Sequence, residues 1–264
     1  MEKLNIESLD LSETNIRAQL DNPQNFDIYI LNTVDSTNIY AKKLAQNGAK
    51  NNTVVIANHQ TSGRGRLGRT FYSPAHTGLY MSILLCPDGR ILDPSALTVA
   101  AAVAVCRSVS TLCDKKPKIK WVNDIFVDSK KICGILAEAG TDSGKLSYII
   151  MGIGLNISTE VFPGELKSIA GSLNTAVNRN IIAGEIINQF NLLRPLCGTQ
   201  SLIDEYKSLS LVLGKKISFT KNGKTYHGTA IDINIEGNLV VCLETNESIV
   251  LKSGEISLGS QNFV

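Results

Sequence analysis

The sequence predicts an α+β fold, in which helices and strands share one large domain and a small β-barrel follows it. Two observations support this prediction. Apolar segments typical of buried strands, at residues 53–57 and 78–85, precede a long apolar segment with helical spacing at residues 94–112. After Gly214 the composition changes to roughly 50 residues of consecutive short strands, which is typical of a small barrel.

The length and composition are those of an ordinary globular protein. The 264 residues suffice for one large domain and a small one, with 43% hydrophobic and 19% charged residues. A net charge of +2 is too small to indicate general binding to nucleic acids or membranes. The first residues lack the layout of a signal peptide and no run of about 20 apolar residues occurs, so we expect a cytoplasmic protein. The six scattered cysteines favour buried thiols over disulfides or a metal site.

The chain begins with a predicted short helix and a strand. Residues 6–20 have amphipathic spacing but are too few for a helix-turn-helix domain, and residues 26–31 alternate like a strand. A second helix, over residues 39–45, follows the polar run Asp35-Ser36-Thr37-Asn38. Such residues cap helix N-termini, and a cap alone is one interpretation. Four in a row exceed what a cap requires, so the run also predicts hydrogen bonds to a polar ligand.

A glycine- and arginine-rich loop is the most informative stretch of the chain. Residues 61–74 interleave three glycines with three arginines, and an aromatic pair and a proline follow. Glycine permits a ligand to approach the backbone closely, and arginine offers planar donors that suit carboxylate and phosphate. A solvated basic loop is the alternative, but the other motifs favour binding of one or more anionic small molecules.

The spacing Gly63-x-Gly65-x-x-Gly68 also matches the dinucleotide-binding fingerprint, and this match is rejected. That fingerprint requires a preceding strand and a helix that opens inside it. Residues 53–57 supply the strand. No helix is predicted after the loop, because Phe71-Tyr72-Ser73-Pro74 is extended or turning and the residue before a proline avoids helical dihedrals.

Residues 118–138 are predicted to form a strand, a polar corner and a β-hairpin. Strict alternation in the second hairpin strand places Lys131, Cys133 and Ile135 on one face of the sheet. Lys130 is then expected on the opposite face. A lysine at the start of an apolar strand either reaches solvent or meets an anion at the sheet end.

The rest of the large domain contains a glycine-containing strand end and two helices. Residues 146–151 are predicted as a strand that leads into Gly152-Ile153-Gly154-Leu155-Asn156, where a ligand can approach beside an amide side chain. Residues 183–196 and 201–209 are predicted helices, and Asn222-Gly223 is a strong hairpin signal within the small barrel. The predicted organisation is an N-terminal extension at residues 1–25, a large domain at residues 26–212 and the barrel at residues 213–264.

Several stretches, each weak by itself, are specific in combination and in order. They are Asp35-Ser36-Thr37-Asn38, residues 60–74, Lys120-Trp121-Val122-Asn123-Asp124, Lys131 with Gly134-Ile135-Leu136, Gly152-x-Gly154-x-Asn156 and Gly254-Glu255-Ile256-Ser257-Leu258. Together they resemble the biotin protein ligases, also called biotin–[acetyl-CoA-carboxylase] ligases. The resemblance covers the chain from about Phe26 to its end.

The resemblance implies a mixed β-sheet flanked by helices, the class II synthetase-like catalytic fold, with a small SH3-like barrel at the C-terminus. Some bacterial members add an N-terminal winged helix-turn-helix and repress biotin synthesis. Only about 25 residues precede Phe26, so the resemblance implies the ligase without the DNA-binding domain and no DNA binding. Phe71 departs from the family, which often has tryptophan there, but another aromatic ring can still stack on a purine.

The reaction implied by the resemblance has two steps. The biotin carboxylate attacks the α-phosphate of ATP, which yields biotinyl-5′-AMP and pyrophosphate. The amine of a specific lysine on a biotin carboxyl carrier domain then attacks the acyl group. Repulsion between two unit charges 4 Å apart is about 4 kcal/mol at an effective dielectric constant near 20. Cations placed in advance, with Mg²⁺ on the phosphates, are therefore the expected catalytic means.

The resemblance also assigns roles to individual residues, with Lys131, Arg66 and Arg64 as the catalytic group. The expected biotin contacts, at the ring, the ureido group and the carboxylate, are Ser36, Thr37, Asn38, Gln60, Arg64, Gly65, Arg66 and Lys131. The expected nucleotide contacts are Arg66, Arg69, Phe71, Asn123, Asp124 and Asn156, with Asp124 also helping to hold Mg²⁺. The loop is expected to close over the adenylate and to shield it from water.

Two other functions stay open at this point. A lipoate ligase shares the fold and the adenylate chemistry, although the glycine–arginine loop and the barrel favour biotin. A non-catalytic biotin sensor would not need Lys131 and the full set of arginines. The sequence leaves open a monomer or a weak homodimer, the identity of the acceptor protein and the role of the barrel.

Overall fold

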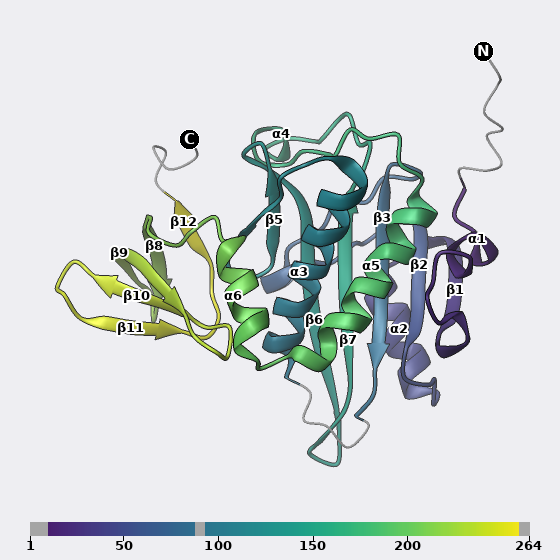
Figure 1. The fold of residues 1–264 in the computed structure, drawn as a ribbon, viewed down its shortest axis with the longest axis horizontal. Coiled ribbons are helices and arrows are strands. Elements are labelled where there is room, and N and C mark those ends of the chain that lie inside the picture. Colours follow the sequence, from purple (N-terminus) through teal and green to yellow (C-terminus); the bar gives the residue numbers. More distant parts are fainter. Residues whose placement is uncertain (1–9, 88–92, 259–264) are drawn as a thin grey trace.

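The structure is a computed structural model that describes residues 10–87 and 93–258 (Figure 1). Within the predicted helix at residues 6–20, residues 6–9 lie outside the described ranges and α1 covers Glu13–Arg17. The six cysteines are all free thiols, and two of them are buried.

The large domain is built on a mixed seven-stranded sheet, as predicted. The strands lie in the order β1-β2-β3-β7-β6-β5-β4, in which β1 pairs parallel to β2 and every other pair is antiparallel. The strands are β1 (Asp27–Val34), β2 (Thr53–Gln60), β3 (Gly78–Leu85), β4 (Lys118–Lys120), β5 (Asp124–Val127), β6 (Lys130–Asp142) and β7 (Lys145–Asn156).

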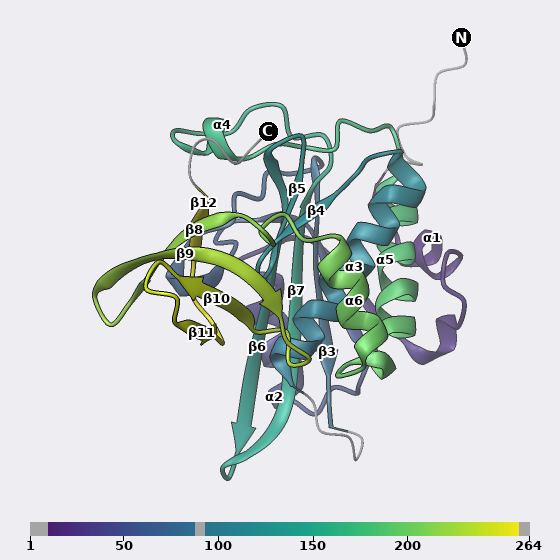
Figure 2. The ribbon, with the colours of Figure 1, turned by 60° about the vertical axis from the view of Figure 1, so that its left-hand side comes forward.

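Helices cover both faces of this sheet (Figures 1 and 2). Helix α2 (Thr37–Gln46) covers one face, and α3 (Pro94–Cys113), α5 (Arg179–Leu193) and α6 (Gln200–Ser208) lie on the other. The short α4 (Leu166–Ile169) lies at one end of the sheet, and 3-10 turns occur at Pro23–Asn25, Arg66–Gly68 and Arg194–Leu196. Alternate strand residues separate the two faces: Val55 and Ile150 pack with α2, whereas Val54 and Met151 belong to the main core. Helix α3 is long and apolar enough to span a membrane, but 67% of its most apolar window is buried, as in a core helix.

The small domain is a second sheet in the order β11-β10-β9-β8-β12. Its strands are β8 (Lys216–Lys221), β9 (Lys224–Ile233), β10 (Leu239–Leu243), β11 (Ser248–Leu251) and β12 (Ile256–Leu258). The predicted hairpin turn is confirmed, because Asn222 and Gly223 join β8 to β9 with φ angles of 51° and 74°. The edge strands β11 and β12 do not pair with each other in the described ranges, so the prediction of a closed barrel is not confirmed.

The small domain packs beside the large one through a few specific contacts. The indole Nε1 of Trp121 donates to the carbonyl of Gly237 at 2.9 Å. The ammonium of Lys207 on α6 lies 2.6 Å from the carboxylate of Asp232 on β9. Glu255, which precedes β12, pairs with Arg69 of the glycine–arginine loop at 2.6 Å. The end of the small domain therefore reaches the same region as the predicted site.

A β-bulge in β6 overturns one prediction about the hairpin. Cys133 pairs with Ile125 but Lys131 pairs with Phe126, so Ile132 is an extra residue on β6. The bulge reverses the alternation, and the Lys131 ammonium lies on the face of Gly134, 3.4 Å from where a β-carbon on Gly134 would stand. The prediction that Lys131 shares a face with Cys133 and Ile135 is therefore wrong, because those two side chains are buried in the core.

Candidate functional site

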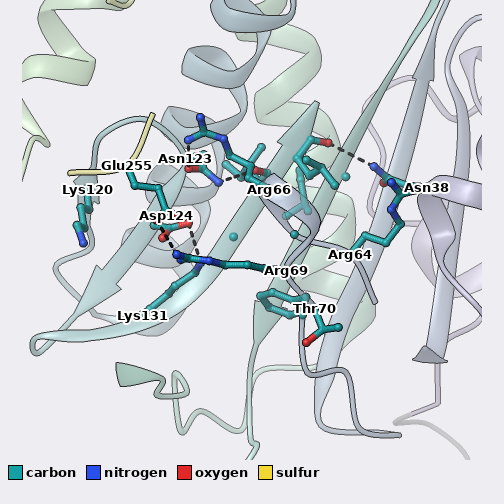
Figure 3. Close-up of a pocket in the computed structure, with 18 of the residues that line it drawn as sticks. Asn38, Arg64, Arg66, Arg69, Thr70, Lys120, Asn123, Asp124, Lys131 and Glu255 are labelled. Carbon is teal, nitrogen blue, oxygen red and sulfur yellow. Dashed lines mark hydrogen bonds and ion pairs between the residues drawn. The ribbon is translucent and has the colours of Figure 1, made fainter. Parts of the chain in front are cut away.

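A cavity of about 380 Å³ lies on the α2 face of the large sheet, between the glycine–arginine loop and the small domain (Figure 3). This volume is within the range of small-molecule sites. The structure brings to its wall every predicted site residue except Asn156. These are Ser36, Thr37, Asn38, Gln60, Arg64, Gly65, Arg66, Arg69, Phe71, Asn123, Asp124 and Lys131.

One end of the cavity, called the neutral end below, is lined mainly by uncharged polar groups, with the Arg64–Glu138 ion pair beside them. The backbone N–H and the hydroxyl of Thr37 both donate to Gln60 Oε1, at 2.8 and 3.1 Å. The Gln60 amide nitrogen donates to Ser73 Oγ at 2.9 Å. Buried Ser82 lies 2.8 Å from Thr37 Oγ1 and 2.6 Å from Asn38 Oδ1. The polar groups are therefore held in fixed orientations, which is the arrangement that recognises a polar uncharged ligand group.

The polar run before α2 is more than a cap, as its length predicts. Ser36 occupies the N-cap position, but its side chain makes no capping hydrogen bond. Thr37 and Asn38 are buried, and their side chains bond to β2, β3 and β6 instead of to the helix. The start of α2 is thus used to form the neutral end of the cavity.

The opposite end of the cavity is charged (Figure 3). The Lys131 ammonium lies 2.7 Å from Asp124 Oδ1, and Arg69 pairs with Glu255 beside it. Burial lowers the pKa of the Lys120 ammonium and nearby Lys131 lowers it further, whereas Asp124 raises it. Three cations and two carboxylates therefore share this end, an arrangement suited to a polyanion that displaces the internal pairs.

Arg66 lies between the two ends of the cavity. Its guanidinium donates to Asn123 Oδ1 at 3.0 Å. The Asn123 amide nitrogen in turn donates to the carbonyl of Ile135 at 2.8 Å, and its backbone carbonyl accepts from the Ile135 N–H. The predicted polar corner is thus fixed to β6 and holds the Arg66 guanidinium at the cavity wall.

Phe71 lies flat against the floor of the cavity because the floor lacks side chains there. A β-carbon on Gly154 would stand 2.7 Å from the Phe71 ring, closer than real contacts allow. The ring also packs edge-on against Tyr80, with centroids 6.5 Å apart. The close approach predicted for the Gly152–Asn156 stretch thus admits an aromatic side chain of the protein.

Asn156 is the predicted site residue that does not line the cavity. It is buried, and its amide nitrogen donates to the carbonyl of Gly171 at 3.0 Å. The Gly171 N–H donates to the carbonyl of Lys131 at 2.9 Å. Asn156 therefore supports the segment beside Lys131 from behind, and its predicted contact with the nucleotide stays a prediction.

Four residues at the site had no assigned role from sequence. Lys120 and Glu255 lie within the motifs quoted above but add charge to the cavity that their motifs alone did not indicate. Ser82 looks like a polar residue inside an apolar strand, and Glu138 like a charge near a strand end. Of these four, only Ser82 could have been found from the sequence: a hydroxyl inside an apolar strand is expected to be buried, and a buried polar group needs a partner.

Comparisons with known proteins show which family the chain is similar to. Residues 30–156 match the sequence model of the Biotin/lipoate A/B protein ligase family, and residues 212–259 match that of the Biotin protein ligase C terminal domain. The bifunctional ligase/repressor BirA of Bacillus subtilis is 35% identical over 240 residues, which cover 86% of this chain and 72% of that protein. The biotin–[acetyl-CoA-carboxylase] ligase of Mycobacterium tuberculosis is 30% identical over 238 residues, 84% of this chain and 85% of that protein.

Solved structures of similar fold give the same result. The biotin protein ligase of Aquifex aeolicus in complex with biotin and ATP superposes with a TM-score of 0.76 at 25% identity, over 88% of this chain and 98% of that chain. The enzyme from Leishmania major in complex with biotinyl-5-AMP has a TM-score of 0.58 at 26% identity, over 86% of this chain and 99% of that chain.

Proposed function

The chain belongs to the biotin protein ligases of the Biotin/lipoate A/B protein ligase family, and from this premise we propose how its cavity works. The protein activates biotin with ATP as biotinyl-5′-AMP and transfers the biotinyl group to a specific lysine of a biotin carboxyl carrier protein. The observation that supports this most directly is the division of one cavity into a neutral polar end and a charged end.

The two ends of the cavity match the two ends of the reacting pair. The uncharged network around Thr37 and Gln60 suits the ureido ring of biotin, which needs both donors and acceptors. The cations around Lys131 suit the triphosphate. Arg66, between them, is within the region where the biotin carboxylate would meet the α-phosphate. This orientation places the reacting atoms beside the two residues that we propose as catalytic, Arg66 and Lys131.

The first step joins two anions, the biotin carboxylate and the phosphates of ATP, and the cations reduce the repulsion between them. A carboxylate oxygen attacks the α-phosphorus, the bond to the bridging oxygen breaks and pyrophosphate leaves with the electron pair. Arg66 and Lys131 reduce the repulsion before the attack and stabilise the charge that develops on the phosphoryl oxygens. In the second step the acceptor amine attacks the acyl carbon, AMP leaves and the amine loses a proton.

The residues at the charged end fit a phosphate-bound Mg²⁺. Magnesium is usually held by one or two carboxylates together with substrate phosphates, and Asp124 is one of the two carboxylates at the charged end. In the described ranges no group of three His, Cys, Asp or Glu side chains forms a dedicated metal site. Asp124 would therefore help to hold a metal that arrives with ATP, and the ion would neutralise phosphate charge.

The small domain has a place in this proposal. We infer that it is an SH3-like module whose β12 end completes the nucleotide side of the cavity through Glu255. Glu255 connects the small domain to Arg69 of the loop, and the carbonyl of Gly237, in the turn between β9 and β10, connects it to the wall residue Trp121. The acceptor carrier domain is expected to approach from outside this rim.

ATP–pyrophosphate exchange by the purified protein tests the proposal. We expect exchange that depends on biotin and not on lipoate, because the ureido ring can hydrogen-bond to the polar groups of the neutral end, whereas an apolar dithiolane ring cannot. Exchange with lipoate alone would instead establish the sister activity. Tight biotin binding without any exchange would contradict catalysis and favour a sensor.

The contact between Phe71 and Gly154 predicts a specific loss of nucleotide affinity. Replacement of Gly154 with alanine adds a β-carbon that forces the ring away from the floor. We expect the KM for ATP to rise roughly tenfold, which corresponds to about 1.4 kcal/mol, while the KM for biotin changes less than threefold. Pyrophosphate exchange at varied ATP measures the effect, and equal rises in both KM values would contradict it.

A further inference from the structure

Glu138 lies on β6 outside the cavity wall, yet its carboxylate contacts two residues that form the wall. Asn38 Nδ2 donates to Glu138 Oε2 at 2.8 Å. The guanidinium of Arg64 lies 3.3 Å from Glu138 Oε1. One side chain therefore links the start of α2 and the glycine–arginine loop to the same central strand.

The contact with Asn38 determines how the neutral end of the cavity is oriented. A carboxylate accepts hydrogen bonds only, so the Asn38 amide must turn its NH₂ group toward Glu138. Its oxygen then faces Ser82 Oγ, 2.6 Å away. Ser82 Oγ also lies 2.8 Å from Thr37 Oγ1, and Thr37 contacts Gln60, so the Asn38 amide stands at one end of the polar network that reaches Gln60. The Asn38 amide is thereby occupied by the protein itself.

The contact with Arg64 determines where the loop crosses the cavity. The three arginines of the glycine–arginine loop are held at three separate places. Arg64 contacts Glu138, Arg66 contacts Asn123 and Arg69 contacts Glu255 (Figure 3 shows the last two pairs). Arg64 thus lies beside Asn38 at the neutral end and not at the charged end. The position of Arg64 fits closure over the ring of biotin better than contact with the α-phosphate.

We propose that Glu138 is a positioning residue that fastens the loop across the neutral end of the cavity and so determines the affinity for biotin. The inference rests on the proposed function, and it moves Arg64 from the phosphate chemistry to retention of the ring. The ion pair is half-exposed, with 48% and 33% of the two side chains accessible, so its own contribution is limited to a factor of about five. The charge-assisted bond to Asn38 adds to it.

Two variants separate the two contacts of Glu138. Glu138→Gln keeps an acceptor oxygen for Asn38 but removes the charge that attracts Arg64, and we expect the Kd for biotin to rise about threefold. Glu138→Ala removes both contacts, and we expect at least a tenfold rise. Isothermal titration calorimetry with biotin alone measures both values. The kcat of pyrophosphate exchange at saturating biotin and the KM for ATP should stay within twofold of the wild type.

A double-mutant cycle tests whether Glu138 acts through Arg64. In an Arg64→Ala background, Glu138→Gln should have no further effect on the Kd for biotin, because the Arg64 guanidinium that the Glu138 charge attracts is already absent. Asp142→Asn, at the exposed end of the same strand, is the matched control and should leave the Kd unchanged.

The outcomes that would overturn the proposed role of Glu138 are distinct from failure of the proposed function. An unchanged Kd in a folded Glu138→Ala protein, a loss mainly in kcat, or a Glu138→Gln effect that persists in the Arg64→Ala background would each reject it. Absence of biotin-dependent exchange by the wild-type protein would reject the ligase function instead. Calorimetric measurement of biotin binding does not require turnover, so the role of Glu138 is tested whether or not the protein catalyses exchange.

Discussion

Replacement of Lys131 with alanine is expected to slow formation of the biotinyl adenylate about a hundredfold, with a much smaller change in the Kd for biotin. The substitution removes a cation from the proposed meeting point of carboxylate and α-phosphate. In the unmodified protein the Lys131 ammonium lies 2.7 Å from the Asp124 carboxylate. The substitution therefore also leaves that carboxylate without a neutralising partner beside a polyanion. Loss of one preorganised donor at developing charge typically reduces rates by 10²–10³, and a hundredfold corresponds to about 2.7 kcal/mol.

Single-turnover formation of the adenylate, followed with labelled ATP at saturating biotin, measures this loss. Lys145→Ala is the matched control, because it removes an exposed lysine at the start of β7, far along the hairpin from the cavity. The neighbouring Lys130 is less suitable, since its ammonium donates to the carbonyls of Lys167 and Ser168 at α4. An unchanged single-turnover rate in Lys131→Ala would remove Lys131 from the catalytic group.

Much of the site was predictable because its residues lie at strand ends and helix starts that sequence motifs mark. Gln60 ends β2, Thr37 begins α2 and Lys131 is the second residue of β6, and each position carries a polar or charged residue next to an apolar run. The excess of polar residues at the start of α2 predicted hydrogen bonds beyond a cap; Thr37 and Asn38 are buried and bond to neighbouring strands, and their contact with a ligand stays a prediction. Local patterns of this kind are encoded within a few residues, so one sequence suffices to find them.

The parts that were missed depend on pairing between distant segments. The bulge at Ile132 arises from the register of β5 against β6, and strict alternation cannot anticipate an inserted residue. Glu138 matters because Asn38, 100 positions away in sequence, and Arg64 of the loop both contact it. The closure of the small barrel likewise depends on whether β11 meets β12, which turn signals do not determine. Such features become visible only when the sheet is assembled.

The neutral end of the cavity should be more sensitive to added volume than the charged end, because it is enclosed by a hydrogen-bonded network. Gly152 faces this network, and a β-carbon there would collide with the Asn38 amide. We expect Gly152→Val to raise the Kd for biotin at least a hundredfold, or about 2.7 kcal/mol, because the branched side chain displaces Asn38 and occupies the ring site. Calorimetric titration with biotin measures the loss.

The affinity for ATP separates this steric effect from general unfolding. Valine suits a strand position, so the Gly152→Val protein should keep the sheet and bind ATP within about threefold of the wild type. Met151→Leu is the matched control, since Met151 is the preceding residue of β7 but packs in the core on the opposite face, where a swap of similar volume is tolerated. Gly152→Ala should fall between the two, because it adds the colliding β-carbon without the branches. A folded Gly152→Val protein with wild-type affinity for biotin would show that the ring does not bind at the neutral end, and the orientation proposed for the two substrates would have to be reversed.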